Sequence, residues 1–171
     1  RQDIISKDGK MSNYEASDFM WCKVENMPPT EDIIRVYYSH QMAAVKVKLV
    51  GGSGFTSDTW ASCEKIVQVD NTIRSAQIDL SNGVPVPYGE VDKSIIMRPQ
   101  TGDIYRAVVV PQSVKAGLSL ISITIDGVSY KHVLDTDMVY NMGKQHNFYI
   151  VVNKRASGDY EFEVSCGEIS E

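Results

Sequence analysis

The segment 118–134, LSLISITIDGVSYKHVL, constrains the fold more than any other stretch of this chain. Asp126-Gly127 stands between two runs of alternating polarity, and this dipeptide favours the two-residue type I′ turn of a β-hairpin. With that turn, the pairs on one face are Ile125–Val128, Ile123–Tyr130 and Ile121–His132. The other face receives the more polar residues Ser122, Thr124, Ser129 and Lys131. Because polarity and turn geometry give the same register, the segment predicts an antiparallel hairpin with one buried face.

Other short runs are rich in β-branched and aromatic residues, with turn residues between them. They are 33–50 (IIRVYYSHQMAAVKVKLV), KIVQV (65–69), SAQIDL (75–80), SIIMRP (94–99), IYRAVVV (104–110), NFYIVVN (147–153) and YEFEVSC (160–166). Within 33–50 the apolar parity changes between Tyr38 and Val45, which predicts a β-bulge near 39–44. No stretch shows a convincing helical period. The chain therefore predicts an all-β fold, an antiparallel β-sandwich of the transthyretin-like or Greek-key type with about seven to ten strands.

Pro111 follows the apolar run 107–110 and removes a backbone N–H from it. Proline within a sheet is confined to edges, strand starts and bulges. We therefore expect the chain to cross between sheets, or to reach a sheet edge, at Pro111-Gln112. The Gln112 amide is expected to satisfy backbone groups freed there.

Residues 1–32 are polar and irregular, and Pro28-Pro29 bars regular structure locally. We expect a lead-in segment here, in which DFMWC (18–22) pairs as a short strand or fills a groove, followed by the sandwich domain over 33–171. The chain begins at Arg1 without a charged-then-apolar leader. A removed leader or a piece of a longer protein would both give this start.

Composition excludes some classes of function. The 171 residues have a formal net charge of −5 and show no run of Lys and Arg, so nucleic acid is not an expected partner. No apolar run approaches the roughly 20 residues of a membrane helix. The cysteines, Cys22, Cys63 and Cys166, lack the CxxC spacing of zinc sites. We expect small core residues with at least one free thiol, and one disulfide remains an alternative.

No catalytic, cofactor-binding or metal-binding residue is predicted. His40, His132 and His146 form no HxH or HExxH pattern, and neither GxSxG nor a Gly-rich phosphate loop is present. His132 is expected as a satisfied histidine of the core or of its rim, and His40 is expected at the bulge. We interpret both histidines as structural.

Two further groups of residues have a structural and a functional interpretation. Asp135 and Asp137 resemble half of a calcium loop, but the rest of that pattern is absent. Trp21, Trp60 and Tyr88 could stack on sugar rings, although aromatic residues of sandwiches more often fill cores and grooves. Ligand-binding residues therefore remain unassigned.

Four stretches, in order, resemble motifs of one family. They are DFMWCKVEN, the strand with a central histidine and alternating K/V half in 33–50, YRAVVVPQSVKAG, and ITIDGVSYKHVL followed by MGKQHNFYIVVNK. Together they resemble the fimbrillin-like proteins of Bacteroidales, the subunits and tip adhesins of type V pili, over roughly residues 3–170. The likeness does not separate shaft, anchor and tip subunits.

The resemblance implies a non-enzymatic structural or adhesive protein of the cell surface and outer membrane, made as a lipoprotein precursor. Its partners would be other fimbrillin subunits, joined by donor-strand insertion, and a host or bacterial surface ligand. The family usually has an amino-terminal β-domain before the DFMWC segment, so 1–32 would include a remnant of that domain. The alternatives are a carbohydrate- or host-ligand-binding surface lipoprotein module, and an enzyme with titratable groups converging in a pocket.

Overall fold

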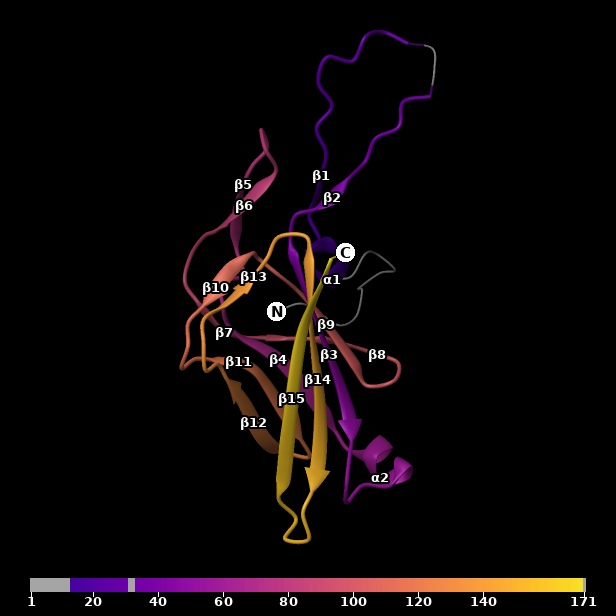
Figure 1. Cartoon of the computed structure of the whole chain (residues 1–171), viewed down its shortest axis with the longest axis vertical. Coiled ribbons are helices and arrows are strands. Elements are labelled where there is room, and N and C mark those ends of the chain that lie inside the picture. The colour runs from indigo at the N-terminus through magenta and orange to yellow at the C-terminus, as the bar shows by residue number, and fades with distance from the viewer. Residues whose placement is uncertain (1–12, 31–32, 171) are drawn as a thin grey trace.

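The computed structural model describes residues 13–30 and 33–170 and shows two main sheets packed face to face (Figure 1). The five-stranded sheet contains, in spatial order, β15 (Tyr160–Ser170), β14 (Lys144–Lys154), β3 (Ala43–Gly51), β9 (Ile104–Val109) and β8 (Arg98–Gln100). The four-stranded sheet contains β12 (Val128–Val133), β11 (Ser119–Ile125), β4 (Lys65–Thr72) and β7 (Asp92–Ile96). The expected all-β sandwich is confirmed.

One hydrophobic core lies between these sheets, and alternate residues of each strand supply it. In β3, Val45, Val47 and Leu49 are at most 1% exposed, while the residues between them are half-buried. β14 and β11 contribute in the same way, and each fully buried aliphatic side chain contributes about 1.5–3 kcal/mol. The period-2 pattern thus places one face of each sheet in the core.

The β11–β12 hairpin has the register that the sequence predicts. β11 and β12 pair Ile125 with Val128 and Ile123 with Tyr130 around the Asp126-Gly127 turn. β14 and β15 pair antiparallel over their full lengths. The isoleucines of β11 are completely buried in the core, whereas β12 is the edge strand of its sheet and Val128 is 51% exposed.

One strand pair departs from the expected antiparallel arrangement, because β14 pairs parallel with β3. A parallel pair needs a long crossover, and here most of the chain lies between the two strands. β3 is antiparallel to its other neighbour, β9. Alternation within single strands gives no information about strand direction, so the sequence did not predict this pair.

The chain changes partners at Pro111, as expected. β9 ends at Val109 in the five-stranded sheet, and β10 (Gln112–Val114) pairs with β13 (Met138–Tyr140) in a separate two-stranded ribbon. The Gln112 amide accepts a hydrogen bond from Ile73 N–H (2.8 Å) and donates to the Ile73 and Val110 carbonyl oxygens (2.9 and 3.0 Å). Both parts of the prediction for this position are confirmed.

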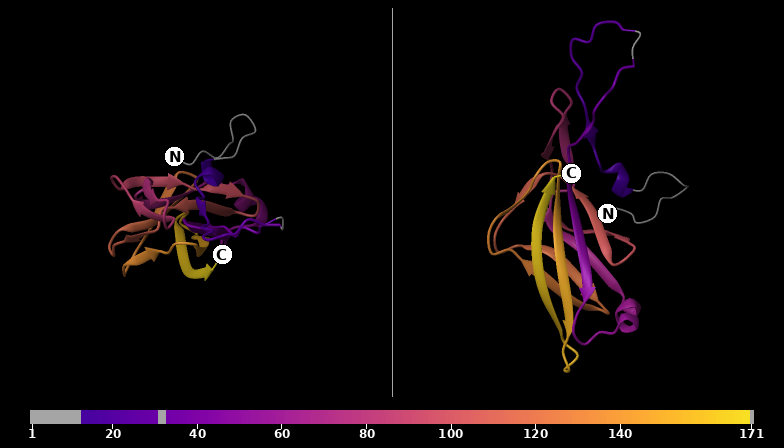
Figure 2. Two further views of the ribbon diagram at one scale, coloured as in Figure 1. Left: turned by 90° about the horizontal axis from the view of Figure 1, so that it is seen from above. Right: turned by 45° about the vertical axis from the view of Figure 1, so that its right-hand side comes forward.

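The prediction of a half-buried strand at 34–38 is wrong. Residues 33–38 form no strand, and Ile33 and Tyr37 are 92% and 79% exposed. With 22–30 they form an arm that projects beyond the end of the sheets (Figures 1 and 2). The arm starts from a short ladder of β1 (Met20–Trp21) and β2 (Ser39–His40), so DFMWC does pair as a strand. The change of parity falls in the break between β2 and β3 rather than in a bulge.

The remaining elements are small. β5 (Ala76–Asp79) and β6 (Val84–Pro87) form a two-stranded ribbon. Pro85 and Pro87, which cannot donate backbone hydrogen bonds, therefore lie outside the main sheets. Two short helices, α1 (Asn13–Ala16) and α2 (Ser57–Ser62), were not expected from the sequence. α2 begins at a capping box of Thr56 and Thr59. Among the described residues, no helix is long and apolar enough to cross a membrane.

Candidate functional site

β15 is an edge strand of the five-stranded sheet. Only β14 pairs with it among the strands that the structure describes. β15 is eleven residues long, and an edge of this length presents a row of unpaired N–H and C=O groups. Such an edge can accept a further strand.

The seam between β15 and the facing edge of the other sheet is closed in one half. There Tyr130 of β12 and Phe162 of β15 stack with ring centroids 4.2 Å apart and an interplanar angle of 9°. Tyr160 meets Phe162 edge-on, with centroids 6.4 Å apart. Stacked rings of this kind exclude water and fix the distance between the two sheets.

The other half of the seam is open. A cavity of about 390 Å³ lies there between β15, β14 and the segment 134–141. Phe148, Leu134 and Met138 give it an apolar lining, and Val139 stands at its mouth with 48% of its surface exposed. An apolar hollow beside an unpaired strand edge is suited to an extended segment, because backbone groups and alternate side chains are satisfied together.

The cavity exists because β15 carries small residues at this level. Inward-facing Tyr160, Phe162 and Val164 are followed by Cys166, and Gly167 comes next. A Cβ atom on Gly167 would meet no other atom within 4 Å. The tripeptide SCG at the end of an alternating strand was the sequence signal for this opening, and sequence reasoning did not use it.

The cysteines are not all core residues. Cys166 is exposed, while Cys22 and Cys63 are half-buried, and all three are free thiols. Burial and a hydrogen bond with Asp126 raise the pKa of Cys63 above its usual value. The expectation of small core residues is therefore wrong for Cys166, because β15 runs past the end of the closed seam.

The three histidines lie on different strands and do not converge. His40 Nδ1 lies 2.9 Å from the Asp18 carboxylate at the base of the arm. His132 is half-buried at the core rim, as expected, and burial lowers its pKa. His146 is 3% exposed, and its Nε2 accepts the Asn141 N–H.

Both tryptophans are engaged in packing and hydrogen bonds. Trp21 Nε1 donates to the Leu80 carbonyl oxygen at 3.2 Å, and Trp60 Nε1 donates to Asp103 at 2.8 Å. Tyr88 is 60% exposed beside the β5–β6 ribbon. The three aromatic residues singled out in the sequence do not form one platform.

Asp137, in the turn that follows β12, hydrogen-bonds to residues of the neighbouring 115–116 segment. Asp137 accepts hydrogen bonds from Lys115 Nζ (2.7 Å) and from Ala116 N–H (2.9 Å). The Lys115 ammonium holds the pKa of Asp137 below its usual value. In residues 13–30 and 33–170, no group of three His, Cys, Asp or Glu side chains has the arrangement of a metal site.

Comparisons with known proteins give one family and one fold. The family model described as fimbrillin-like matches residues 4–167. The comparison with curated proteins gives no match. Among solved structures, a candidate cell adhesion protein of Bacteroides uniformis superposes with a TM-score of 0.63 at 14% identity, over 80% of this chain and 53% of its own.

Two other solved structures are similar, and both are candidate cell adhesion proteins. The one from Bacteroides ovatus has a TM-score of 0.57 at 11% identity, over 81% of this chain and 48% of its own. The one from Bacteroides fragilis has a TM-score of 0.56 at 16% identity, over 78% and 48%. At these identities the likeness shows the fold alone, and the chain spans about half the length of these structures.

Proposed function

This chain belongs to the fimbrillin-like family, and from that premise we propose that it is a non-enzymatic structural subunit or adhesin of a cell-surface fimbria that joins its neighbours by β-strand addition. The open half of the seam beside β15 is the single observation that carries the assembly mode. Its proposed occupant is an extended segment of another fimbrillin subunit.

The geometry supports this mode in two ways. Insertion along β15 would pair the free backbone edge, which removes the main liability of an exposed strand. Every second side chain of the inserted strand would enter the apolar cavity against Phe148 and Met138. Backbone pairing supplies affinity and the cavity supplies specificity and register.

The finer features implied by the resemblance are part of this proposal. They are the outer-membrane location, a lipoprotein precursor, and the division at residue 32 between a lead-in and the carboxy-terminal domain. A non-enzymatic role agrees with a site made of strand edge and apolar side chains. The placement as shaft, anchor or tip subunit is left open.

A substitution at the mouth of the cavity tests strand addition. In cells that assemble the protein, Val139→Asp should remove the ladder of oligomers seen on denaturing gels without heating. The buried face of an inserted strand would then meet an unpaired carboxylate. Val139 is 48% exposed, so the folded chain itself should keep its stability within about 0.5 kcal/mol.

Val86→Asp is the matched control, because Val86 is 57% exposed on the β5–β6 ribbon away from the seam. This variant should assemble normally. An unchanged ladder for Val139→Asp would show that subunits do not join through this seam.

A further inference from the structure

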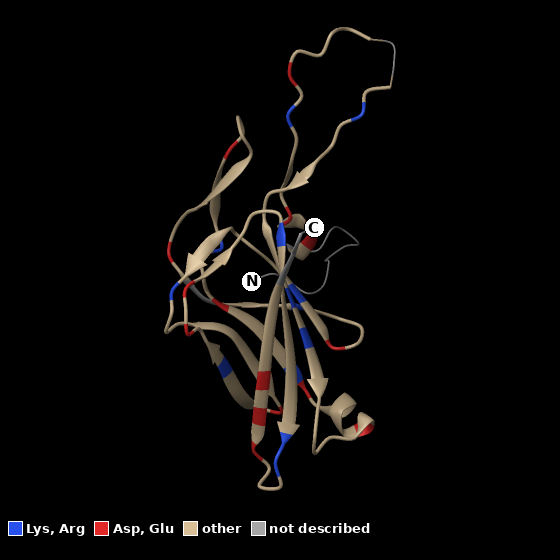
Figure 3. Ribbon diagram, in the orientation of Figure 1, with Lys and Arg blue, Asp and Glu red and all other residues tan. Residues whose placement is uncertain are grey.

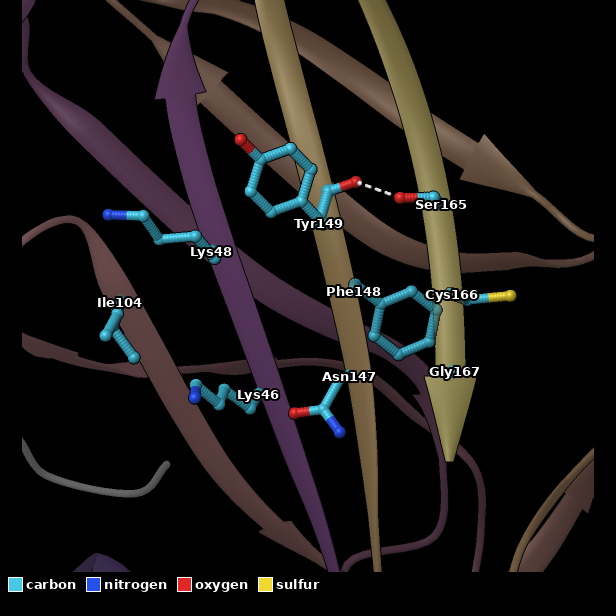
Figure 4. A pocket seen from close by; sticks show the side chains of 9 residues that line it. All are labelled: Lys46, Lys48, Ile104, Asn147, Phe148, Tyr149, Ser165, Cys166 and Gly167. Carbon is cyan, nitrogen blue, oxygen red and sulfur yellow. Dashed lines mark hydrogen bonds between the residues drawn. The ribbon is translucent and has the colours of Figure 1, made fainter. Parts of the chain in front are cut away.

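The outward face of the five-stranded sheet holds a second cavity, which borders the seam cavity and shares Phe148, Cys166 and Gly167 with it. It measures about 390 Å³, which is within the range of small-molecule sites. Figure 4 shows Lys46 and Lys48 on β3 and Asn147 and Tyr149 on β14 around it. Ser165 of β15 completes the polar lining. The strand register places these side chains in two adjacent rows that cross the sheet.

The first row sets three cations side by side, because Arg106 also pairs with Arg98 of β8, whose guanidinium lies 3.1 Å from the Glu15 carboxylate. Lys46 pairs directly with Arg106 of β9, and Asn147 is the partner of Lys46 on its other side. Like charges opposite one another on a sheet are destabilising. Among the described residues, neither Lys46 nor Arg106 has a carboxylate within ion-pair distance, and Arg106 Nε is buried without a hydrogen-bond partner. An anionic ligand at Lys46 would offset the like-charge repulsion between Lys46 and Arg106.

The second row supplies the surface for a ring. Tyr149 lies between Lys48 and Ser165, and 47% of its surface is exposed. Lys48 Nζ donates to the Gly102 carbonyl oxygen and keeps further N–H donors available. The exposed phenol ring offers a stacking face, while Asn147 and Ser165 offer hydrogen bonds to hydroxyl groups.

The acidic residues of this sheet do not neutralise the cations. Glu161 and Glu163 lie on the half of β15 nearer its hairpin turn, opposite Asn153 and Val151 of β14, and Figure 3 shows acidic residues on that part of the strand. Glu161 pairs with Arg155 (3.0 Å), and Glu163 accepts the Asn153 amide (2.8 Å). In a chain of net charge −5, this face therefore keeps a local positive charge.

We propose that this cavity binds an acidic saccharide, a sugar ring bearing a carboxylate or sulfate that lies against Tyr149 with its charge at Lys46 and Lys48. A simple inorganic anion would leave the Tyr149 face unused. A large protein surface would not need a hollow of this size. The inference goes beyond strand addition, because it assigns a saccharide ligand to the lysines and Tyr149 on the outward side of the sheet, none of which lines the seam cavity.

Calorimetric titration of the 171-residue chain at low salt tests the proposal with defined probes. A tetrasaccharide of galacturonic acid and a tetrasaccharide of galactose 6-sulfate represent the two acids. At least one should bind, and the tighter one identifies the acid. The methyl ester of the galacturonic acid tetrasaccharide keeps the rings without the charge and should bind at least about tenfold more weakly.

Variants then locate the site. Lys46→Gln should weaken binding about tenfold, whereas Lys131→Gln, an exposed strand lysine of the other sheet, should change it less than about twofold. Tyr149→Ala should weaken binding of the acidic probe, and Tyr149→Phe should retain it because the ring remains. These variants should leave the oligomer ladder intact, while Val139→Asp should leave saccharide binding intact, so the two proposals fail separately.

Four results of the binding experiments would overturn the assignment. They are equal binding of the methyl ester, sodium sulfate binding as tightly as the saccharides, no binding of any probe at millimolar concentration, and equal effects of Lys46→Gln and Lys131→Gln. A change of oligomeric state in Lys46→Gln, measured by sedimentation, would instead make this face a protein contact and would also overturn it.

Discussion

At the residue scale, the Gln112 side chain hydrogen-bonds to backbone groups at the point where Pro111 interrupts the strand. Pro111 ends the β9 ladder, and the Gln112 amide then satisfies the Ile73 N–H and the Ile73 and Val110 carbonyl groups. The proline and the amide acted as sequence signals because each has a fixed chemical consequence. The bonding partner Ile73 could not be named in advance, since it is 39 residues away.

Replacing that amide should therefore be costly. Gln112→Leu keeps the approximate side-chain size but leaves backbone groups without partners, and it should lower the free energy of unfolding by about 3 kcal/mol. Urea denaturation measures the change. Ser113→Ala, at the exposed neighbouring position, should have an effect below about 0.5 kcal/mol. Equal effects of the two substitutions would contradict the role given to the amide.

The facing of the β11–β12 hairpin gives a second prediction at this scale. Ile123 is completely buried, and Lys131 lies on the opposite, exposed face. Ile123→Asp should destabilise the fold by about 3–5 kcal/mol through a buried unpaired charge. Lys131→Asp should cost less than about 1 kcal/mol. Thermal or urea melting that gave similar losses would reverse the assigned faces.

At the element scale, hairpins were predictable and non-local pairings were not. The Asp126-Gly127 turn fixes the register of β11 and β12 because a two-residue loop allows one arrangement. The pairing of β3 with β14 depends on segments far apart in the chain, and the residues 33–38 have strand-like alternation without forming a strand. Alternating polarity shows that a segment is suited to a β-strand, but the strand forms only where a neighbouring strand is available to pair with it.

The turn itself can be tested through its glycine. Gly127 has φ of +83°, and a Cβ atom there would meet nothing within 4 Å. Gly127→Ala should therefore cost about 1–2 kcal/mol of unfolding free energy from backbone conformation alone. Gly167→Ala is the control, because that glycine lies in β15 with the same open space and without a positive φ. A loss at Gly167 as large as the loss at Gly127 would refute the conformational explanation.

At the scale of the whole molecule, the sequence predicted a sandwich but not its openings. Which strands become edges depends on the complete strand order, so the cavity beside β15 could not be located from alternation. The basic cavity was missed for a related reason. Lys46 and Arg106 are 60 positions apart in number and become neighbours only through the register of β3 with β9. The absence of a Lys/Arg run therefore did not exclude a basic surface.

Assembly through the seam should change the reactivity of one thiol. Cys166 is exposed at the edge of the open half in the single chain. Maleimide labelling, read site by site by mass spectrometry, should be fast for the isolated chain and at least about tenfold slower in assembled fimbriae, where an inserted strand covers the site. Cys22, half-buried at the start of the arm, serves as the internal control. Equal labelling of Cys166 in both states would exclude this mode of assembly.

The pair of β3 and β14 also has a consequence for how the chain reaches its native state. Hydrogen bonds at the end of this pair join Ser53 to Asn153, 100 positions later in the sequence. Domains dominated by such distant pairings fold in milliseconds to seconds, because a large loop must close before the contacts form. A chain that emerges from its amino-terminal end must keep β3 unpaired on one side until residue 154 follows. One edge of β3 therefore stays unpaired, and open to wrong pairing, during most of the synthesis of the chain.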